Sequence, residues 1–182
     1  DMILKDDRFA SIVEAVKHGR IIFSNIRKFI VYLLSCNISE VLIIGTASTF
    51  SSHLPITPLQ VLFLNLVTDV FPALALGMGQ GDSGYLKEPP RKSKEKILEQ
   101  HHWGFIFLYG GIITLSVIFV FYICLNHFHF STTKSTTLAF LTLGLSQVFH
   151  VFNLRGEKSS VLINDITKNI HVWGAVLLCV FL

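Results

Sequence analysis

Five long apolar segments restrict the fold of this chain more than any other feature of its sequence. They lie at about 29–50, 57–78, 103–125, 136–153 and 170–182. A stretch of about 18 or more apolar residues can cross a bilayer, and inside hydrocarbon a helix satisfies its own backbone hydrogen bonds. The sequence therefore predicts an all-α, polytopic membrane protein. The fifth segment stops at Leu182, short of the roughly 20 residues that a spanning helix needs, so we expect a fragment of a longer chain.

The composition agrees with a membrane location. Hydrophobic residues make up 51% of the chain and charged residues 15%, which is too apolar for an ordinary soluble domain. The N-terminus is charged and lacks a signal-peptide pattern. Cys36, Cys124 and Cys179 lie in apolar runs at unrelated spacings, so we interpret them as small buried residues rather than a disulfide or zinc framework. No nucleic-acid partner is expected.

The borders of the apolar segments carry helix signals. Residues 1–28 are amphipathic and pass into the first segment without a break, which predicts one long helix that enters the membrane. The short connection "SSHLPI" joins the first two segments as a tight hairpin. Thr57 suits a helix N-cap and Pro58 suits the first helical position. Gly110 and Gly111, in the third segment, predict close helix packing.

Positive charges alternate from one connection to the next. Of the 15 Lys and Arg residues, all except Lys134 lie in residues 1–28, 79–101 and 154–169. Cytoplasmic loops of membrane proteins carry the excess of Lys and Arg. We therefore expect the N-terminus and these two loops to be cytoplasmic, with the hairpin turn and the loop that holds Lys134 on the opposite side.

Two carboxylates lie inside the predicted spanning segments without a fixed cation. Glu40 is in the middle of the first segment and Asp69 in the middle of the second, whereas no Lys or Arg lies within any of the five. An unpaired carboxylate at the bilayer centre costs about 2.5–3.5 kcal/mol or more. It can take up a proton or a mobile cation, and both alternatives indicate ion handling.

Side chains that carry oxygen atoms accompany both carboxylates. Asn37 and Glu40 are spaced to lie near one face of a helix. Asn65, Thr68 and Asp69 share a face of the next helix in the same way. Ca²⁺ takes about six to eight oxygen ligands of this kind, whereas copper and zinc prefer imidazole and thiolate. Because a short turn joins the two helices, the sequence predicts a cation site that these five residues share.

Two further residues bear on this site. Pro72 has no backbone N–H and leaves the carbonyl of Thr68 without its helical partner, and loosened backbone near the bilayer midplane supplies carbonyl ligands in several transporters. Gln147, in the fourth segment, is a further candidate for the lining of the site. The alternative is structural, because single Asn, Thr or Gln side chains in membrane helices often only link neighbouring helices.

Several stretches of the chain resemble one family. They are "DMILKDDRFASIVEAVKHGRIIFSNIRKFI" at the N-terminus, "SCNISEV", "NLVTDVFPALALG" and the loop "EPPRKSKE". Together they resemble the C-terminal part of P-type cation-transporting ATPases of the calcium-pump group, over nearly the whole chain. The resemblance implies a C-terminal transmembrane helix bundle. Residues 1–28 would be the cytoplasmic end of the phosphorylation domain with its stalk helix, and residues 29–182 the transmembrane cation-transport domain.

The resemblance also implies which residues bind the ion. Asn37 and Glu40 match calcium ligands of the family's fifth membrane helix, and Asn65, Thr68 and Asp69 match those of its sixth. Gln147 departs from the pattern, since two-site calcium pumps have a Glu ligand there on the eighth helix. We therefore expect one Ca²⁺ per cycle or a changed ion preference.

The function implied by the resemblance is export of Ca²⁺ from the cytoplasm by an ATP-driven pump. The D-K-T-G-T phosphorylation motif is not in this chain, so Mg²⁺ and ATP would bind elsewhere in the parent protein. Its partners would be the lipid bilayer and the missing N-terminal part, with actuator, nucleotide-binding and phosphorylation domains. A pump for Mn²⁺, Na⁺ or H⁺ and a non-catalytic membrane scaffold stay open as alternatives. We expect a bacterial plasma membrane rather than a eukaryotic internal membrane.

Overall fold

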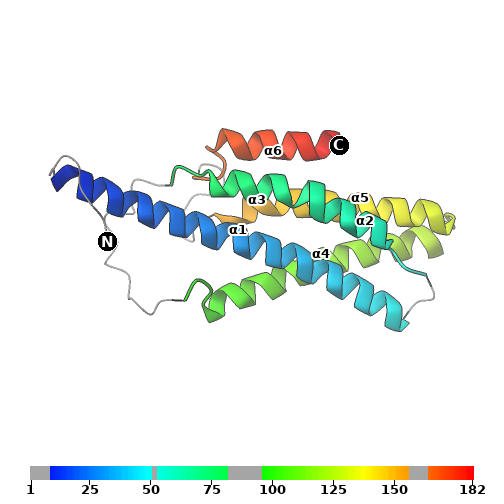
Figure 1. The fold of residues 1–182 in the computed structure, drawn as a ribbon. Coiled ribbons are helices and arrows are strands. Elements are labelled where there is room, and N and C mark those ends of the chain that lie inside the picture. Colours follow the sequence, from blue (N-terminus) through cyan, green and yellow to red (C-terminus); the bar gives the residue numbers. More distant parts are fainter. Residues whose placement is uncertain (1–8, 51–52, 82–95, 156–163) are drawn as a thin grey trace.

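The chain folds as a bundle of helices (Figure 1). The computed structural model describes residues 9–50, 53–81, 96–155 and 164–182. The elements are α1 (Phe9–Phe50), α2 (Pro58–Phe63), the π-helical turn η1 (Leu64–Thr68), α3 (Val70–Gly77), α4 (Gln100–Asn126), α5 (Thr132–His150), the 3-10 turn η3 (Val151–Leu154) and α6 (Ile170–Phe181). Within the described residues, four helical stretches are long and apolar enough to cross a membrane, and α6 is a shorter apolar helix. The predicted all-α architecture is confirmed.

The first helix is long and unbroken. α1 has 42 residues, so at 1.5 Å per residue it is about 60 Å long, roughly twice the thickness of the hydrocarbon core. In Figure 1 it runs along most of the bundle. The prediction of one continuous helix is confirmed from Phe9 onward, and residues 1–8 lie outside the described residues. A helix of this length extends beyond the membrane at one end at least.

The start of the second segment follows the predicted cap. Thr57 and Gln60 form a capping box, in which Gln60 N donates to Thr57 Oγ1 at 3.4 Å and Thr57 N donates to Gln60 Oε1 at 2.8 Å. Pro58 occupies the first turn, where its missing N–H would have no helical partner. Both predictions for the start of this helix are confirmed.

The middle of the second segment departs from a regular α-helix, next to the place where Pro72 predicts a loosened backbone. Asp69 N donates to the carbonyl of Leu64 at 3.0 Å, five residues back, so the backbone is π-helical between α2 and α3. Pro72 follows within one turn, and its ring is incompatible with a regular hydrogen bond to Thr68. A wider turn just before a proline accommodates this disruption, and such π turns are frequent at functional sites.

Two apolar clusters hold the bundle together, with polar residues between them. One cluster includes Cys36, Ala75 and Val148. The other includes Ile43, Leu64 and Leu143. Along α1, along the α2–α3 segment and along α5, the positions between the two clusters contain the buried polar residues Glu40, Thr68, Asp69 and Gln147. The core therefore has a polar layer in its middle.

Close packing between α1 and α4 occurs at Gly110. A Cβ atom there would lie 3.0 Å from Ile38 Cγ2 and 3.3 Å from the carbonyl of Ser35, so the glycine allows this close approach. Thr114 reinforces the contact by donating to the carbonyl of Ser39 at 3.2 Å. The prediction of close packing is confirmed at Gly110 and wrong at Gly111, where a Cβ would meet no described atom within 4 Å.

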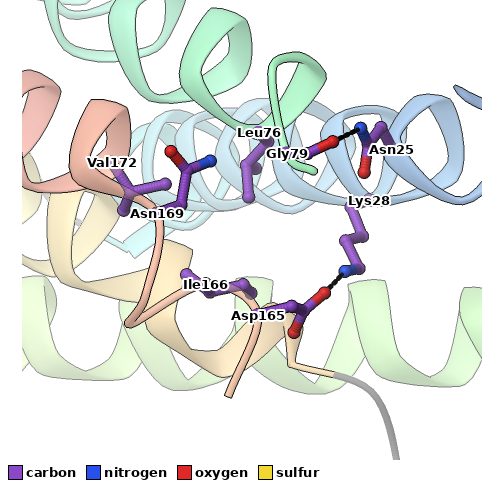
Figure 2. Close-up of a pocket in the computed structure, with 8 residues that line it drawn as sticks. All are labelled: Asn25, Lys28, Leu76, Gly79, Asp165, Ile166, Asn169 and Val172. Carbon is purple, nitrogen blue, oxygen red and sulfur yellow. Dashed lines mark hydrogen bonds and ion pairs between the residues drawn. The ribbon is translucent and has the colours of Figure 1, made fainter. Parts of the chain in front are cut away.

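Polar side chains tie three helices together at one end of the bundle (Figure 2). Asn25 on α1 donates to the carbonyl of Gly79, just after α3, at 2.6 Å. Lys28 forms an ion pair with Asp165, and Asn169 donates to a carbonyl near the end of α3 at 3.0 Å. Asn169, and Asn25 through a second hydrogen bond to the carbonyl of Gly77 at 3.2 Å, satisfy carbonyls that α3 leaves free at its C-terminus. These side chains line a small pocket of about 10 Å³, roughly the room of one water molecule.

The segments predicted to share one side of the membrane meet at this end. Arg27 Nε donates to the carbonyl of Ile97, in the loop before α4, at 2.9 Å. Lys28 pairs with Asp165, in the loop before α6. The arrangement agrees with the alternation of positive charge along the sequence. Which side of a membrane this end faces stays a prediction.

Candidate cation site

Glu40 is the most strongly held residue of the polar layer. It is 4% exposed, and each of its carboxylate oxygens accepts one hydrogen bond. Asn65 Nδ2 donates to Oε2 and Gln147 Nε2 donates to Oε1, both at 3.0 Å. Hydrogen bonds of this kind offset part of the cost of burying a charge. Glu40 therefore links α1, the π-helical turn and α5 at one depth of the bundle.

Asp69 contrasts with Glu40. It is 1% exposed, and neither of its carboxylate oxygens has a hydrogen-bond partner within the described part of the chain. The Cys36 thiol, a weak donor, faces the carboxylate without reaching hydrogen-bond geometry. The charge of Glu40 is close enough to act on Asp69. An ion of opposite charge, or a proton, would compensate this buried and unpaired group.

The carbonyl of Thr68 is freed from the helix as the sequence predicted. Pro72 cannot donate to it, and it accepts a long hydrogen bond of 3.4 Å from the Tyr32 hydroxyl. The Cys179 thiol of α6 lies 3.9 Å from the same oxygen. A carbonyl oxygen has two acceptor positions, so with Tyr32 at one of them a cation could replace the weak thiol contact at the other.

The structure brings most, but not all, of the predicted residues together. Glu40 and Asn65 are in direct contact, and Thr68 and Asp69 lie on the same segment as Asn65. Gln147 reaches Glu40, with its own Oε1 buried and unpartnered among the described residues. Asn37 stands apart, because it lies on an exposed side of α1. No hydrogen bond joins its side chain to any of the described residues.

The chemistry of the layer suits a hard cation. It presents two carboxylates, amide oxygens, a hydroxyl and a freed carbonyl, which are oxygen ligands of the kind that Ca²⁺ takes. Among residues 9–50, 53–81, 96–155 and 164–182, no three His, Cys, Asp or Glu side chains are grouped to hold a metal ion.

Sequence reasoning missed three residues beside the site. Tyr32 and Cys179 approach the carbonyl of Thr68 from α1 and α6. His150, at the end of α5, is buried and stacks on Tyr32. The sequence does place His150 one helical turn after Gln147, which was the available signal for His150. Nothing in the spacing indicates that Tyr32 faces the second apolar segment.

Spanning helices around a buried polar layer with two carboxylates are the features of an ion-transporting membrane domain. The chain belongs to the family described as "Cation transporting ATPase, C-terminus", whose sequence model matches residues 53–182. The predicted family is thereby confirmed, and the chain is part of a multi-pass membrane protein.

Individual relatives agree with this family. The chain is 39% identical over 181 residues to a calcium-transporting ATPase of Bacillus subtilis, and the aligned part is 100% of this chain and 20% of the relative. It is 38% identical over 178 residues to a calcium-transporting ATPase of Listeria monocytogenes, with 98% of this chain and 20% of the relative covered. A P-type sodium-transporting ATPase of Plasmodium falciparum is 35% identical over 159 residues, which are 84% of this chain and 13% of that protein. The chain thus spans about a fifth or less of these relatives.

Proposed function

We propose that this chain is the transmembrane transport portion of an ATP-driven pump that exports Ca²⁺ from the cytoplasm. The ion would bind at Glu40, Asn65, Thr68 and Asp69. The observation that carries the proposal is the carboxylate of Asp69, which is 1% exposed and has no hydrogen-bond partner in the described residues. A buried charge without a partner is costly, and a transported cation would supply the missing compensation.

The identity of the ion rests on the ligand chemistry and on the relatives. Carboxylate, amide and carbonyl oxygens suit Ca²⁺, and relatives from two bacteria are named calcium-transporting ATPases. A relative named a sodium-transporting ATPase supports Na⁺ as the second candidate. Mn²⁺ also accepts oxygen ligands, and a proton could neutralise either carboxylate.

The rest of the pump would contain the domains that this chain lacks. We propose that residues 1–28 form the end of the phosphorylation domain and the stalk, and that residues 29–182 form the transport domain. Mg²⁺ and ATP would be bound in the parent protein outside this chain, and the missing N-terminal part would contain the actuator, nucleotide-binding and phosphorylation domains. Asn37 is exposed on the face of α1 that the described helices leave uncovered, so it would contribute to the site only together with a part of the pump outside this chain. The clustered Lys and Arg residues favour a cytoplasmic N-terminus.

ATP-driven uptake of radioactive Ca²⁺ into inside-out vesicles that contain the full-length pump tests this function. We expect uptake that needs ATP, is blocked by vanadate and is not reduced by Na⁺. Strong competition by Na⁺, or Na⁺ uptake in place of Ca²⁺ uptake, would favour the second candidate. Absence of ATP-driven uptake of any of these ions would instead indicate a membrane scaffold, if variants of the polar layer impair only the assembly of the protein.

Gln147 sets the expected number of ions. The Gln147→Glu variant is expected to raise the Ca²⁺ transported per ATP from about one to about two, because a third buried carboxylate supplies oxygen ligands and charge for a second divalent ion. The measurement is the ratio of Ca²⁺ uptake to ATP hydrolysis in the same vesicles.

The matched control for this variant is Gln100→Glu. It makes the same amide-to-carboxylate change at the exposed start of α4 and should leave the ratio unchanged. An unchanged ratio in Gln147→Glu, with uptake intact, would contradict the proposed role of this position in stoichiometry.

A further inference from the structure

A buried histidine lies one helical turn beyond the polar layer. His150 is 2% exposed at the end of α5, although the transport site as described does not use it. Its Nδ1 lies 3.4 Å from Asn153 Nδ2, and its Nε2 has no hydrogen-bond partner in the described part of the structure. An incompletely satisfied buried polar group calls for an explanation. This side chain also makes contacts through its ring.

His150 is packed among aromatic rings from two helices. Its ring is nearly parallel to that of Tyr32 on α1, with centroids 6.0 Å apart and an interplanar angle of 16°. Tyr109 and Phe105 on α4 also contact it, with centroid distances of 4.8 and 6.5 Å. Stacked aromatic pairs of this kind contribute about 0.5–1.5 kcal/mol beyond their burial. The flat ring at position 150 therefore restricts how Tyr32 can be oriented.

Tyr32 in turn holds the peptide group that orients Asp69. Its hydroxyl donates to the carbonyl of Thr68 at 3.4 Å, while the N–H of the same peptide group donates to Leu64 at 3.0 Å. This peptide group is thus held at both ends, in the π-helical turn where the ordinary helical bonds are disrupted. A bond of 3.4 Å is near the limit for a hydrogen bond, so a small tilt of Tyr32 would break it.

We propose that His150 is a positioning residue for the cation site, acting through Tyr32 on the Thr68–Asp69 peptide group. This inference rests on the proposed function of Asp69. In this arrangement His150 does not touch the ion. Its stacking keeps the Tyr32 hydroxyl against the Thr68 carbonyl, and that contact fixes the direction in which Asp69 presents its carboxylate.

The test is a double-mutant cycle in the full-length pump, measured as the Ca²⁺ concentration for half-maximal uptake and the maximal rate in vesicles. We expect His150→Ala and Tyr32→Phe each to raise the half-maximal concentration about 3- to 10-fold, the effect of one lost hydrogen bond, with the maximal rate within about twofold of wild type. The double variant should be no worse than the more affected single variant, because both changes remove the same contact. His150→Phe, which keeps a flat ring, should restore nearly wild-type affinity.

Controls separate positioning from general damage to α5. Phe149→Ala shortens the neighbouring side chain, which is 54% exposed, and should leave the half-maximal concentration unchanged. If His150→Ala fails to accumulate, His150→Leu fills the space without a flat ring and is expected to show the same loss of affinity. Additive effects in the double variant, unchanged or increased affinity in the single variants, or failure of His150→Phe to restore affinity would each overturn the proposal.

Asp69→Asn in the same vesicles distinguishes failure of the proposed cation site from failure of the positioning role of His150. Retained uptake in Asp69→Asn would overturn the proposed site itself. Lost uptake in Asp69→Asn, together with wild-type affinity in His150→Ala, would overturn only the positioning role of His150.

Discussion

The Asp69→Asn variant of the full-length pump is expected to lose ATP-driven Ca²⁺ uptake while its ion-free form stays at least as stable as wild type. The amide has nearly the same shape as the carboxylate but carries no charge. Loss of a buried charge partner costs about 3–5 kcal/mol, which would weaken Ca²⁺ binding by about 100-fold or more. Because both Asp69 oxygens lack hydrogen-bond partners in the described residues, removing the charge also removes an uncompensated burial cost.

Two measurements check this prediction together. Vesicle uptake reports transport, and thermal unfolding in detergent without Ca²⁺ reports stability. Glu14→Gln, which removes one negative charge at an exposed position of α1, should change neither. A marked loss of stability in Asp69→Asn would indicate that this carboxylate holds the bundle together, as the scaffold alternative requires.

Glu40→Ala is expected to lose uptake as well, but with the opposite effect on stability. Asn65 Nδ2 and Gln147 Nε2 both donate to the Glu40 carboxylate at 3.0 Å. Its removal leaves two donors in the polar layer without their acceptor, at a cost of about 1–3 kcal/mol each. The apparent melting temperature of the ion-free pump should therefore fall, whereas that of Asp69→Asn should not.

Glu40→Gln separates the structural part of this role from the ionic part. An amide oxygen at position 40 can accept from one of the two donors, and Gln147 can turn its own amide to satisfy the other group. We therefore expect Glu40→Gln to recover much of the melting temperature lost in Glu40→Ala without recovering uptake. Recovery of uptake would show that the charge of Glu40 is dispensable for the ion.

Local sequence signals were enough to predict the helices and the buried polar residues that form the candidate site. The capping box at Thr57 and Gln60 depends on residues three apart, and the break at Pro72 follows from a missing N–H. The burial of Glu40 and Asp69 is expected because ionisable side chains within spanning segments face the interior of the bundle rather than lipid. In each case the deciding interaction lies within one segment, so its chemistry can be read from neighbouring residues.

The remaining features depend on how the helices face one another. Helical spacing places Asn37 near the face of Glu40. Their directions around the helix axis still differ by enough that Asn37 is exposed and Glu40 is buried. The hydrogen bond from Gln147 to Glu40 and the stacking of His150 on Tyr32 join residues more than a hundred positions apart. Periodicity within a single segment does not specify these contacts.

Equilibrium binding of radioactive Ca²⁺ to the purified full-length pump, in the absence of ATP, tests the central claim most directly. The cation is proposed to bind in the polar layer, with Asp69 as the carboxylate that needs it. Wild type and Glu14→Gln should then bind Ca²⁺ with the same affinity, and Asp69→Asn should show a loss of about 100-fold or more. Binding by Asp69→Asn that matches wild type in affinity and amount would contradict the account.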